Sequence, residues 1–284
     1  DMLRLPLQQN SGFIALLLGM SILIGCKSNS KKAEISETDF EKIENSEGKI
    51  QKLLVGSFAE GDDQGIYQLD FNTETGLLSN SHRVAIESKP GYLYLSKNGD
   101  MVYSSNGTKP GSVSAFQWND DKTALERVAN LPSIGDGACY VGVSPEEHLV
   151  AAANYSSGSI VLYPLDDKGV ILEEPQGIQH TGSGPHPNQK SAHAHCVQFS
   201  QNGKFLYAVD LGIDQILTYP INSENKLGKA EVGLQLDPGD GPRHLVFHPT
   251  QNMVFIINEL SSTVVSATLD EETGVFTKID KKST

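Results

Sequence analysis

The sequence predicts an all-β protein, specifically a β-propeller built from four-stranded blades. Apolar and polar residues alternate along many short segments, and turn residues separate these segments. The same order of strands and turns recurs through most of the chain, with a period close to that of a propeller blade. The repeated region has no helical periodicity, so the segments are interpreted as strands.

Four segments share one plan: a strand, a polar turn, a second strand, a short polar gap and a third strand. They cover residues 91–118, 139–165, 195–221 and 244–269, and a less complete unit precedes them at 52–79. The equivalent turn positions Lys97, Pro145, Gln201 and Pro249 are 48, 56 and 48 residues apart, and the middle step is longer because it contains an insertion. Each unit continues into a hairpin and a further strand, so residues 50–284 accommodate about five blades. This period is too long for a parallel β-helix.

The N-terminal part is predicted to lie outside this fold. Residues 1–26 have a weakly positive start at Arg4 and a short apolar run, and they end in a small residue followed by Cys26, which resembles a bacterial lipobox. Residues 27–49 are polar and charged, which indicates a disordered tether. We therefore expect an exported protein that is lipid-anchored through Cys26 on the periplasmic or outer-membrane face. The protein would be cytosolic if residues 1–26 did not act as a signal.

The net charge of the chain limits the kinds of molecule that it is expected to bind. The chain has 22 basic and 35 acidic residues and a formal charge of −13, which argues against nucleic acids and wide anionic membrane surfaces. Membrane contact is thus expected through the lipid anchor alone, and the sequence indicates no oligomeric state. Cys139 and Cys196 lie in apolar runs of different repeat units, so we expect buried free thiols rather than a disulfide.

The repeat register identifies residues that should meet around the propeller axis. Six residues before the equivalent turn positions lie Gly91, Cys139, His195 and Arg243. Nine residues after them lie Asn106, Asn154, Asp210 and Asn258, with Glu259 directly following the last. Polar residues that interrupt apolar strands need partners, since burying an unpaired polar group is costly. For the asparagines, a ring of structural hydrogen bonds between blades is the alternative to a binding role.

From this set we expect a catalytic group of His195, Arg243, Glu259 and Asp210, with Asn154 and His193 contacting the substrate. The sequence has no nucleophile elbow, P-loop or CxxC pair. Histidine, arginine and carboxylates instead suit the activation of water, with arginine stabilising negative charge.

The histidines themselves require two further interpretations. His193 and His195 should point to opposite faces of a strand, and no acidic ligand lies near them in sequence, so we expect no metal ion. A loop containing His186, Lys190 and His193 is an alternative anion-attracting surface. His244 and His248 are interpreted as packing or surface residues.

The segments HAHCVQFSQNGKFLYAVDLGIDQILTY, PGDGPRHLVFHP and INELSSTV resemble the lactonase propeller family, which includes 6-phosphogluconolactonases and carboxy-muconate lactonizing enzymes. The resemblance runs from about residue 53 to the end of the chain. It implies a fold of seven blades, so about two blades are expected beyond the C-terminal truncation. It also implies that His195, Arg243 and Glu259 form the site, with Asp210 a weaker match.

The resemblance further implies hydrolysis of 6-phospho-glucono-1,5-lactone to 6-phosphogluconate in the pentose phosphate pathway, without a cofactor. Export is difficult to reconcile with a cytosolic phosphorylated metabolite, so an unphosphorylated sugar lactone is a second hypothesis for the small-molecule substrate. Two other classes stay open: a non-catalytic surface propeller that binds a partner or glycan, and a muconate-type lactonizing cycloisomerase.

Overall fold

The computed structural model describes residues 50–283. The predicted signal segment 1–26 with Cys26, the tether 27–49 and Thr284 lie outside the described residues. Within the described range, no helix combines the length and apolar character needed to cross a membrane.

Residues 50–283 form five antiparallel sheets, each built from strands that are consecutive in sequence. Blade 1 has β1 (Ile50–Ser57), β2 (Gly65–Asn72) and β3 (Leu78–Ala85), with the short 3-10 helix η1 (Gly61–Asp63) between the first two. Blade 2 has β4 (Pro90–Leu95), β5 (Met101–Asn106), β6 (Ser112–Trp118) and β7 (Leu125–Pro132). Blade 3 has β8 (Ala138–Val143), β9 (Leu149–Asn154), β10 (Ser159–Pro164) and β11 (Gln176–Gln179). Blade 4 has β12 (Ala194–Phe199), β13 (Phe205–Asp210), β14 (Gln215–Pro220) and β15 (Glu231–Gln235). Blade 5 has β16 (Pro242–Phe247), β17 (Met253–Asn258), β18 (Thr263–Asp270) and β19 (Val275–Ser283).

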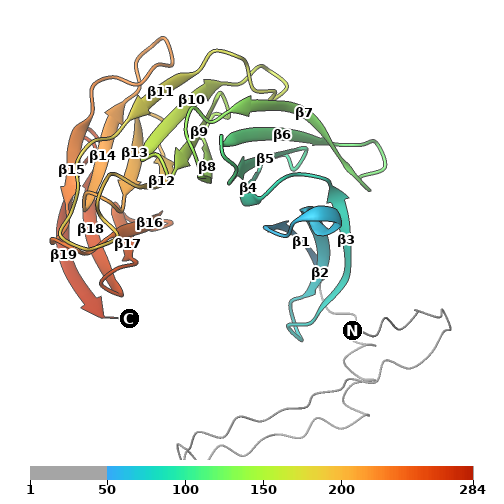
Figure 1. Cartoon of the computed structure of the whole chain (residues 1–284), viewed down its shortest axis with the longest axis horizontal. Coiled ribbons are helices and arrows are strands. Elements are labelled where there is room, and N and C mark those ends of the chain that lie inside the picture. Colours follow the sequence, from blue (N-terminus) through green and yellow to red (C-terminus); the bar gives the residue numbers. More distant parts are fainter. Residues whose placement is uncertain (1–49, 284) are drawn as a thin grey trace, which may run out of the picture. The chain divides into compact units, whose positions relative to one another are not determined.

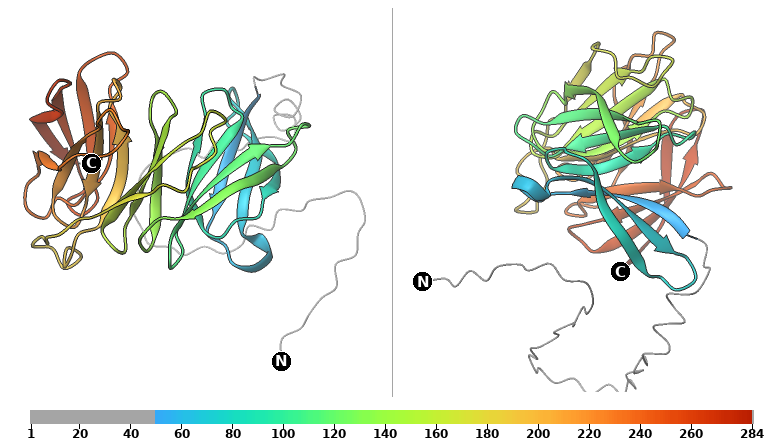
Figure 2. Two further views of the ribbon diagram at one scale, coloured as in Figure 1. Left: turned by 90° about the horizontal axis from the view of Figure 1, so that it is seen from above. Right: turned by 90° about the vertical axis from the view of Figure 1, so that its right-hand side faces the viewer.

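The blades follow one another around an arc in the order of the sequence, from blue to red (Figures 1 and 2). The first strands β1, β4, β8, β12 and β16 line its inner side, and those of neighbouring blades contact one another (Figure 1). This arrangement confirms the predicted propeller of four-stranded blades. Blade 1, which has three strands, corresponds to the unit that looked less complete in the sequence.

The second strands of blades 2, 3 and 4 are buried on both faces, because a neighbouring blade packs against each side. Every residue of β5, β9 and β13 is buried. Small residues allow the close approach of neighbouring blades: a side chain at Gly142 in β8 would lie 2.8 Å from the carbonyl oxygen of Val197 in β12. Cys139 and Cys196 are both free, as the sequence predicts, but only Cys196 is fully buried, whereas Cys139 is half-buried.

The first strand of each complete blade contains the same irregularity. Its pairing with the second strand skips one residue, which is characteristic of a β-bulge. The skipped residues are Gly91, Cys139, His195 and Arg243. These are the four positions that share one repeat register in the sequence. The bulge therefore gives that register a structural meaning, because it changes the direction in which the side chain points.

Candidate active site

The bulges of blades 4 and 5 bring His195 and Arg243 into one electrostatic environment. His195 is only 8% exposed, and its ring lies 5.1 Å from the ring of His244, which directly follows Arg243 in β16. Burial is the main reason that the pKa of His195 falls to about 4, and the positive charge of Arg243 lowers it further. Burial and Arg243 also lower the pKa of His244 to about 4. Both imidazoles are therefore neutral at pH 7.

Arg243 is oriented by an ion pair with Glu259. Arg243 Nε lies 3.1 Å from Glu259 Oε2, and the two side chains are 44% and 43% exposed. The backbone N–H of Glu259 also donates to the carbonyl oxygen of Gly241, at 2.8 Å, which fixes the carboxylate beside the start of β16. Such an exposed pair contributes little to stability. The closest contact of the pair is made by Nε of Arg243, and the 44% exposed side chain is accessible to a ligand.

Tyr155 connects the histidines of blade 4. The ring of His193 stacks on Tyr155 with centroids 4.6 Å apart, and the ring of His195 meets Tyr155 edge-on at 5.5 Å. His193 Nδ1 also donates to the carbonyl oxygen of Tyr155, at 2.8 Å. The prediction that His193 and His195 point to opposite faces is thus wrong, because the bulge interrupts the alternation and both rings contact one tyrosine.

A cavity of about 380 Å³ adjoins His244 on the inner side of the blades. Tyr92 of β4 and Tyr140 of β8 stack there with centroids 3.9 Å apart, and Tyr140 meets the ring of His244 at 5.3 Å. The remaining wall combines Gln198 with apolar residues of blade 5. The cavity thus offers aromatic faces beside the neutral imidazoles.

Asp210, predicted to belong to the catalytic group, makes no hydrogen bond to the ring of His195. It is fully buried, and it accepts hydrogen bonds from His180 Nδ1 at 2.7 Å and from the backbone N–H groups of His193 and Gly212 at 2.8 and 2.9 Å. The ring of His195 is not among its partners, and His195 Nδ1 has no hydrogen-bond partner within residues 50–283. Asp210 therefore acts on the backbone ahead of His195 rather than on its ring.

The contacts of Asn154 also differ from the prediction that it binds the substrate. It is fully buried, and its Nδ2 donates to the carbonyl oxygen of Ser133 at 2.8 Å and to Ser159 Oγ at 3.0 Å. Asn106 and Asn258 likewise donate to hydroxyl groups at the start of the next strand of their own blades. These bonds hold blade hairpins and the adjoining connection, so the asparagines are structural. Asn154 reaches the connection between blades 2 and 3, whereas the bonds of Asn106 and Asn258 lie within their own blades, so the alternative of a continuous ring between blades is not formed by these three.

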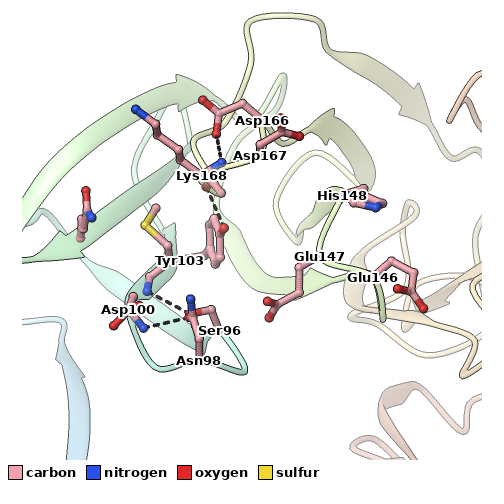
Figure 3. Close-up of a pocket in the computed structure, with 13 residues that line it drawn as sticks. Ser96, Asn98, Asp100, Tyr103, Glu146, Glu147, His148, Asp166, Asp167 and Lys168 are labelled. Atoms are coloured by element: carbon pink, nitrogen blue, oxygen red, sulfur yellow. Dashed lines mark hydrogen bonds between the residues drawn. The ribbon is translucent and has the colours of Figure 1, made fainter.

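A second cavity, of about 450 Å³, lies at the other end of the strands in blades 2 and 3 (Figure 3). Its walls are rich in carboxylates, which disfavours an anionic ligand. They include Asp100, Glu146, Glu147, Asp166 and Asp167. Across residues 50–283, no group of three or more His, Cys, Asp or Glu side chains has an arrangement that could hold a metal ion.

Sequence reasoning missed the contribution of His244, Tyr155 and Tyr140. His244 was interpreted as a packing or surface residue because alternation was expected to continue through Arg243. The bulge at Arg243 explains the error, because the residue that follows a bulge no longer keeps the alternating direction of the strand. Tyr155 directly follows Asn154 in a turn, and Tyr140 directly follows the bulge residue Cys139.

The fold defines a β-propeller that carries polar residues on the inner strands of blades 4 and 5. The chain belongs to the lactonase family: residues 52–284 match the family described as "Lactonase, 7-bladed beta-propeller". This confirms the resemblance seen in the three sequence motifs.

Individual relatives agree with this assignment. The 6-phosphogluconolactonase of Bacillus subtilis is 30% identical over 226 residues, covering 79% of this chain and 64% of the relative. A protein named 6-phosphogluconolactonase from Formosa agariphila is 31% identical over 221 residues, covering 75% and 62%. The structure of the periplasmic gluconolactonase PpgL of Pseudomonas aeruginosa has a TM-score of 0.77 and 26% identity, covering 83% of this chain and 69% of that one. The chain thus spans about two thirds of the length of these relatives.

Proposed function

We propose that the protein hydrolyses the 1,5-lactone of a sugar acid at the site formed by His195 and Arg243. The observation that carries this proposal is the pair of adjacent bulges, which place a neutral imidazole beside a fixed guanidinium. Relatives named as lactonases support the reaction class.

In the proposed reaction, a water molecule attacks the lactone carbonyl carbon while His195 accepts a proton from that water. The terminal nitrogens of Arg243 donate to the carbonyl oxygen as it gains negative charge. The ring C–O bond then breaks, and the departing oxygen takes the proton from His195, which is neutral again. Glu259 is assigned to holding Arg243 Nε rather than to proton transfer, because its carboxylate already accepts the guanidinium.

The charge of the described site favours an unphosphorylated lactone over 6-phospho-glucono-1,5-lactone. Arg243 is matched by Glu259, and the imidazoles of His195 and His244 are neutral at pH 7. A phosphate group is usually recognised by surplus cationic donors. We therefore expect glucono-1,5-lactone to be the better substrate of the two.

The test measures hydrolysis of glucono-1,5-lactone, with and without the 6-phosphate, by the purified full-length protein. The expected result is acceleration of both, with the larger kcat/KM for the neutral lactone, and loss of activity in His195→Ala. His82→Ala is the matched control, because His82 is an exposed histidine in blade 1. Failure to accelerate either lactone would reject the hydrolase and favour a binding propeller. Turnover of a muconate-derived lactone alone would favour the cycloisomerase.

We also propose that the protein is exported and anchored through a lipid on Cys26. The support is the lipobox-like end of residues 1–26 and the polar segment that follows. Metabolic labelling with a radioactive fatty acid should mark the wild-type protein in the membrane fraction, and Cys26→Ala should abolish the label. A labelled Cys26→Ala variant would contradict the proposal.

A further inference from the structure

We propose that the turn from β13 to β14, residues 210–214, positions both halves of the active site through two buried carboxylates. Asp210 holds the backbone that leads into His195, and Asp214 holds the backbone that leads into Arg243. The kinetic part of this inference rests on the proposed lactonase function, and its structural part does not.

Asp210 acts on the blade 4 side. One carboxylate oxygen accepts the backbone N–H of His193, two residues before His195, and the other accepts His180 Nδ1. Asp210 also pairs in the strand ladder with Ala194, the residue directly before the bulge. The carboxylate thus fixes the chain where it enters the bulge that carries the catalytic imidazole.

Asp214 acts across the blade boundary. It is 3% exposed, and its Oδ1 accepts the backbone N–H of Gly241 at 2.8 Å, while its Oδ2 accepts that of Gly239 at 2.8 Å. Gln189 Nε2 completes the set with a bond of 2.7 Å to Oδ1. Gly241 lies two residues before Arg243, so a side chain of blade 4 holds the segment that leads into the bulge of blade 5.

The same contact extends to the partner of Arg243. The carbonyl oxygen of Gly241 accepts the backbone N–H of Glu259 at 2.8 Å, so Asp214 fixes one peptide segment that touches both members of the ion pair. Gly241 has a φ of +59°, and a side chain there would lie 2.3 Å from Leu260. The segment therefore has little room for another conformation.

At the same repeat positions, blades 2, 3 and 5 do not have the two carboxylates that blade 4 has. The position of Asp210 is occupied by asparagine in blades 2, 3 and 5. The position of Asp214 is occupied by Pro110, Gly158 and Ser262, and none of these is a carboxylate. Asp214 has a φ of +57° and Gly158 a φ of +63°, so the same left-handed turn position is filled by glycine in blade 3. Ser262 has a φ of +52° at the same position of blade 5, so the turn geometry does not require an aspartate. The bonds of Asp214 to the backbone N–H groups of Gly239 and Gly241 are what set this position apart.

The test uses Asp214→Gly in the full-length protein, because glycine suits the left-handed backbone and removes only the carboxylate. We expect kcat to fall about tenfold, with KM changed less than about threefold, as for a misplaced group that acts in the transition state. In the Arg243→Ala background the same substitution should lower kcat by less than about twofold, since coupled residues are not additive. Equal losses in both backgrounds would overturn the inference. Asp214→Asn, which keeps one acceptor oxygen, should restore part of kcat.

A second measurement is independent of activity. Histidine NMR titration should show the pKa values of His195 and His244 rising in Asp214→Gly, because the charge of Arg243 lowers both of them in the native arrangement. Unchanged histidine pKa values in folded Asp214→Gly would reject the positioning role. If the pKa values shift but the wild-type protein hydrolyses neither lactone, only the proposed lactonase function is rejected.

The matched control is Asp166→Ala in the turn after β10. Asp166 also accepts two backbone N–H groups, those of Lys168 and Val170, but it lies at the other end of the strands (Figure 3). It should leave kcat and both histidine titrations unchanged. If it moved them as Asp214→Gly does, the effect would be a general loosening of the blades and the inference would fall.

Discussion

Blades 2 and 3 have the same bulge as blades 4 and 5, but they carry different chemistry on it. The bulge residues are Gly91 and Cys139 in the first pair and His195 and Arg243 in the second. The first pair offers no strong acid, base or charge, because burial raises the pKa of the Cys139 thiol to about 12. The backbone geometry is thus a property of the repeat, and the proposed active site depends on the side chains placed on it in two blades.

The largest effect is expected from Arg243→Ala, which removes the charged bulge side chain that distinguishes blade 5 from blades 2 and 3. If the guanidinium stabilises charge that develops only in the transition state, kcat should fall about 100-fold to 1,000-fold while KM changes little. Steady-state kinetics on glucono-1,5-lactone measure it. Lys282→Ala is a suitable control, because Lys282 is an exposed cation that is paired with Asp280 on the outer strand of the same blade. Unchanged turnover in folded Arg243→Ala would remove this role.

Asn154→Leu tests whether the second register position is structural. The substitution removes two hydrogen bonds in a fully buried place, so the free energy of unfolding should fall by about 1–3 kcal/mol. The activity of the folded fraction should persist. Urea unfolding measures the loss, and Asn188→Leu, at an exposed asparagine, should change stability by less than about 0.5 kcal/mol. A stable but inactive Asn154→Leu would restore the substrate-binding interpretation.

The pH dependence of stability sharpens the same comparison. The pKa of His195 is about 4 in the folded protein against an ordinary value of 6.5, so between these values the unfolded chain binds the additional proton. This contribution to stability is therefore complete above pH 6.5 and is lost as the pH falls toward 4. His195→Gln should flatten the decline between pH 7 and 5 in urea unfolding, whereas His82→Gln should leave it unchanged. An unaltered slope in His195→Gln would show that His195 titrates normally.

Much of the fold was predictable because it depends on patterns that repeat. Alternation and period gave the blades, and the register identified His195 and Arg243 before the bulge was known. The family match then supports the same interpretation from similarity.

The directions and partners of individual side chains were not predictable in the same way. Asp210 looked like a catalytic partner because its repeat register should place it near the propeller axis with His195 and Arg243. Its actual partner, His180, precedes it by 30 residues and lies outside the repeated strands. The bulge likewise reverses the expected direction of His193 relative to His195, and no alternation rule contains that information.

The smallest effect on kcat is expected at Cys139, the bulge residue of blade 3. Cys139 Sγ lies 3.4 Å from the carbonyl oxygen of His195, so the thiol contacts the backbone of the proposed catalytic residue. Sulfur makes weak hydrogen bonds, and Cys139→Ala should therefore change kcat by less than about twofold. Steady-state kinetics of Cys139→Ala and Cys196→Ala should be measured together. Because Cys196→Ala leaves a space at a buried position, the comparison distinguishes a local effect at Cys139 from a general effect on packing. A tenfold loss in Cys139→Ala alone would mean that blade 3 contributes to the chemistry, and that the division between the two pairs of blades is drawn in the wrong place.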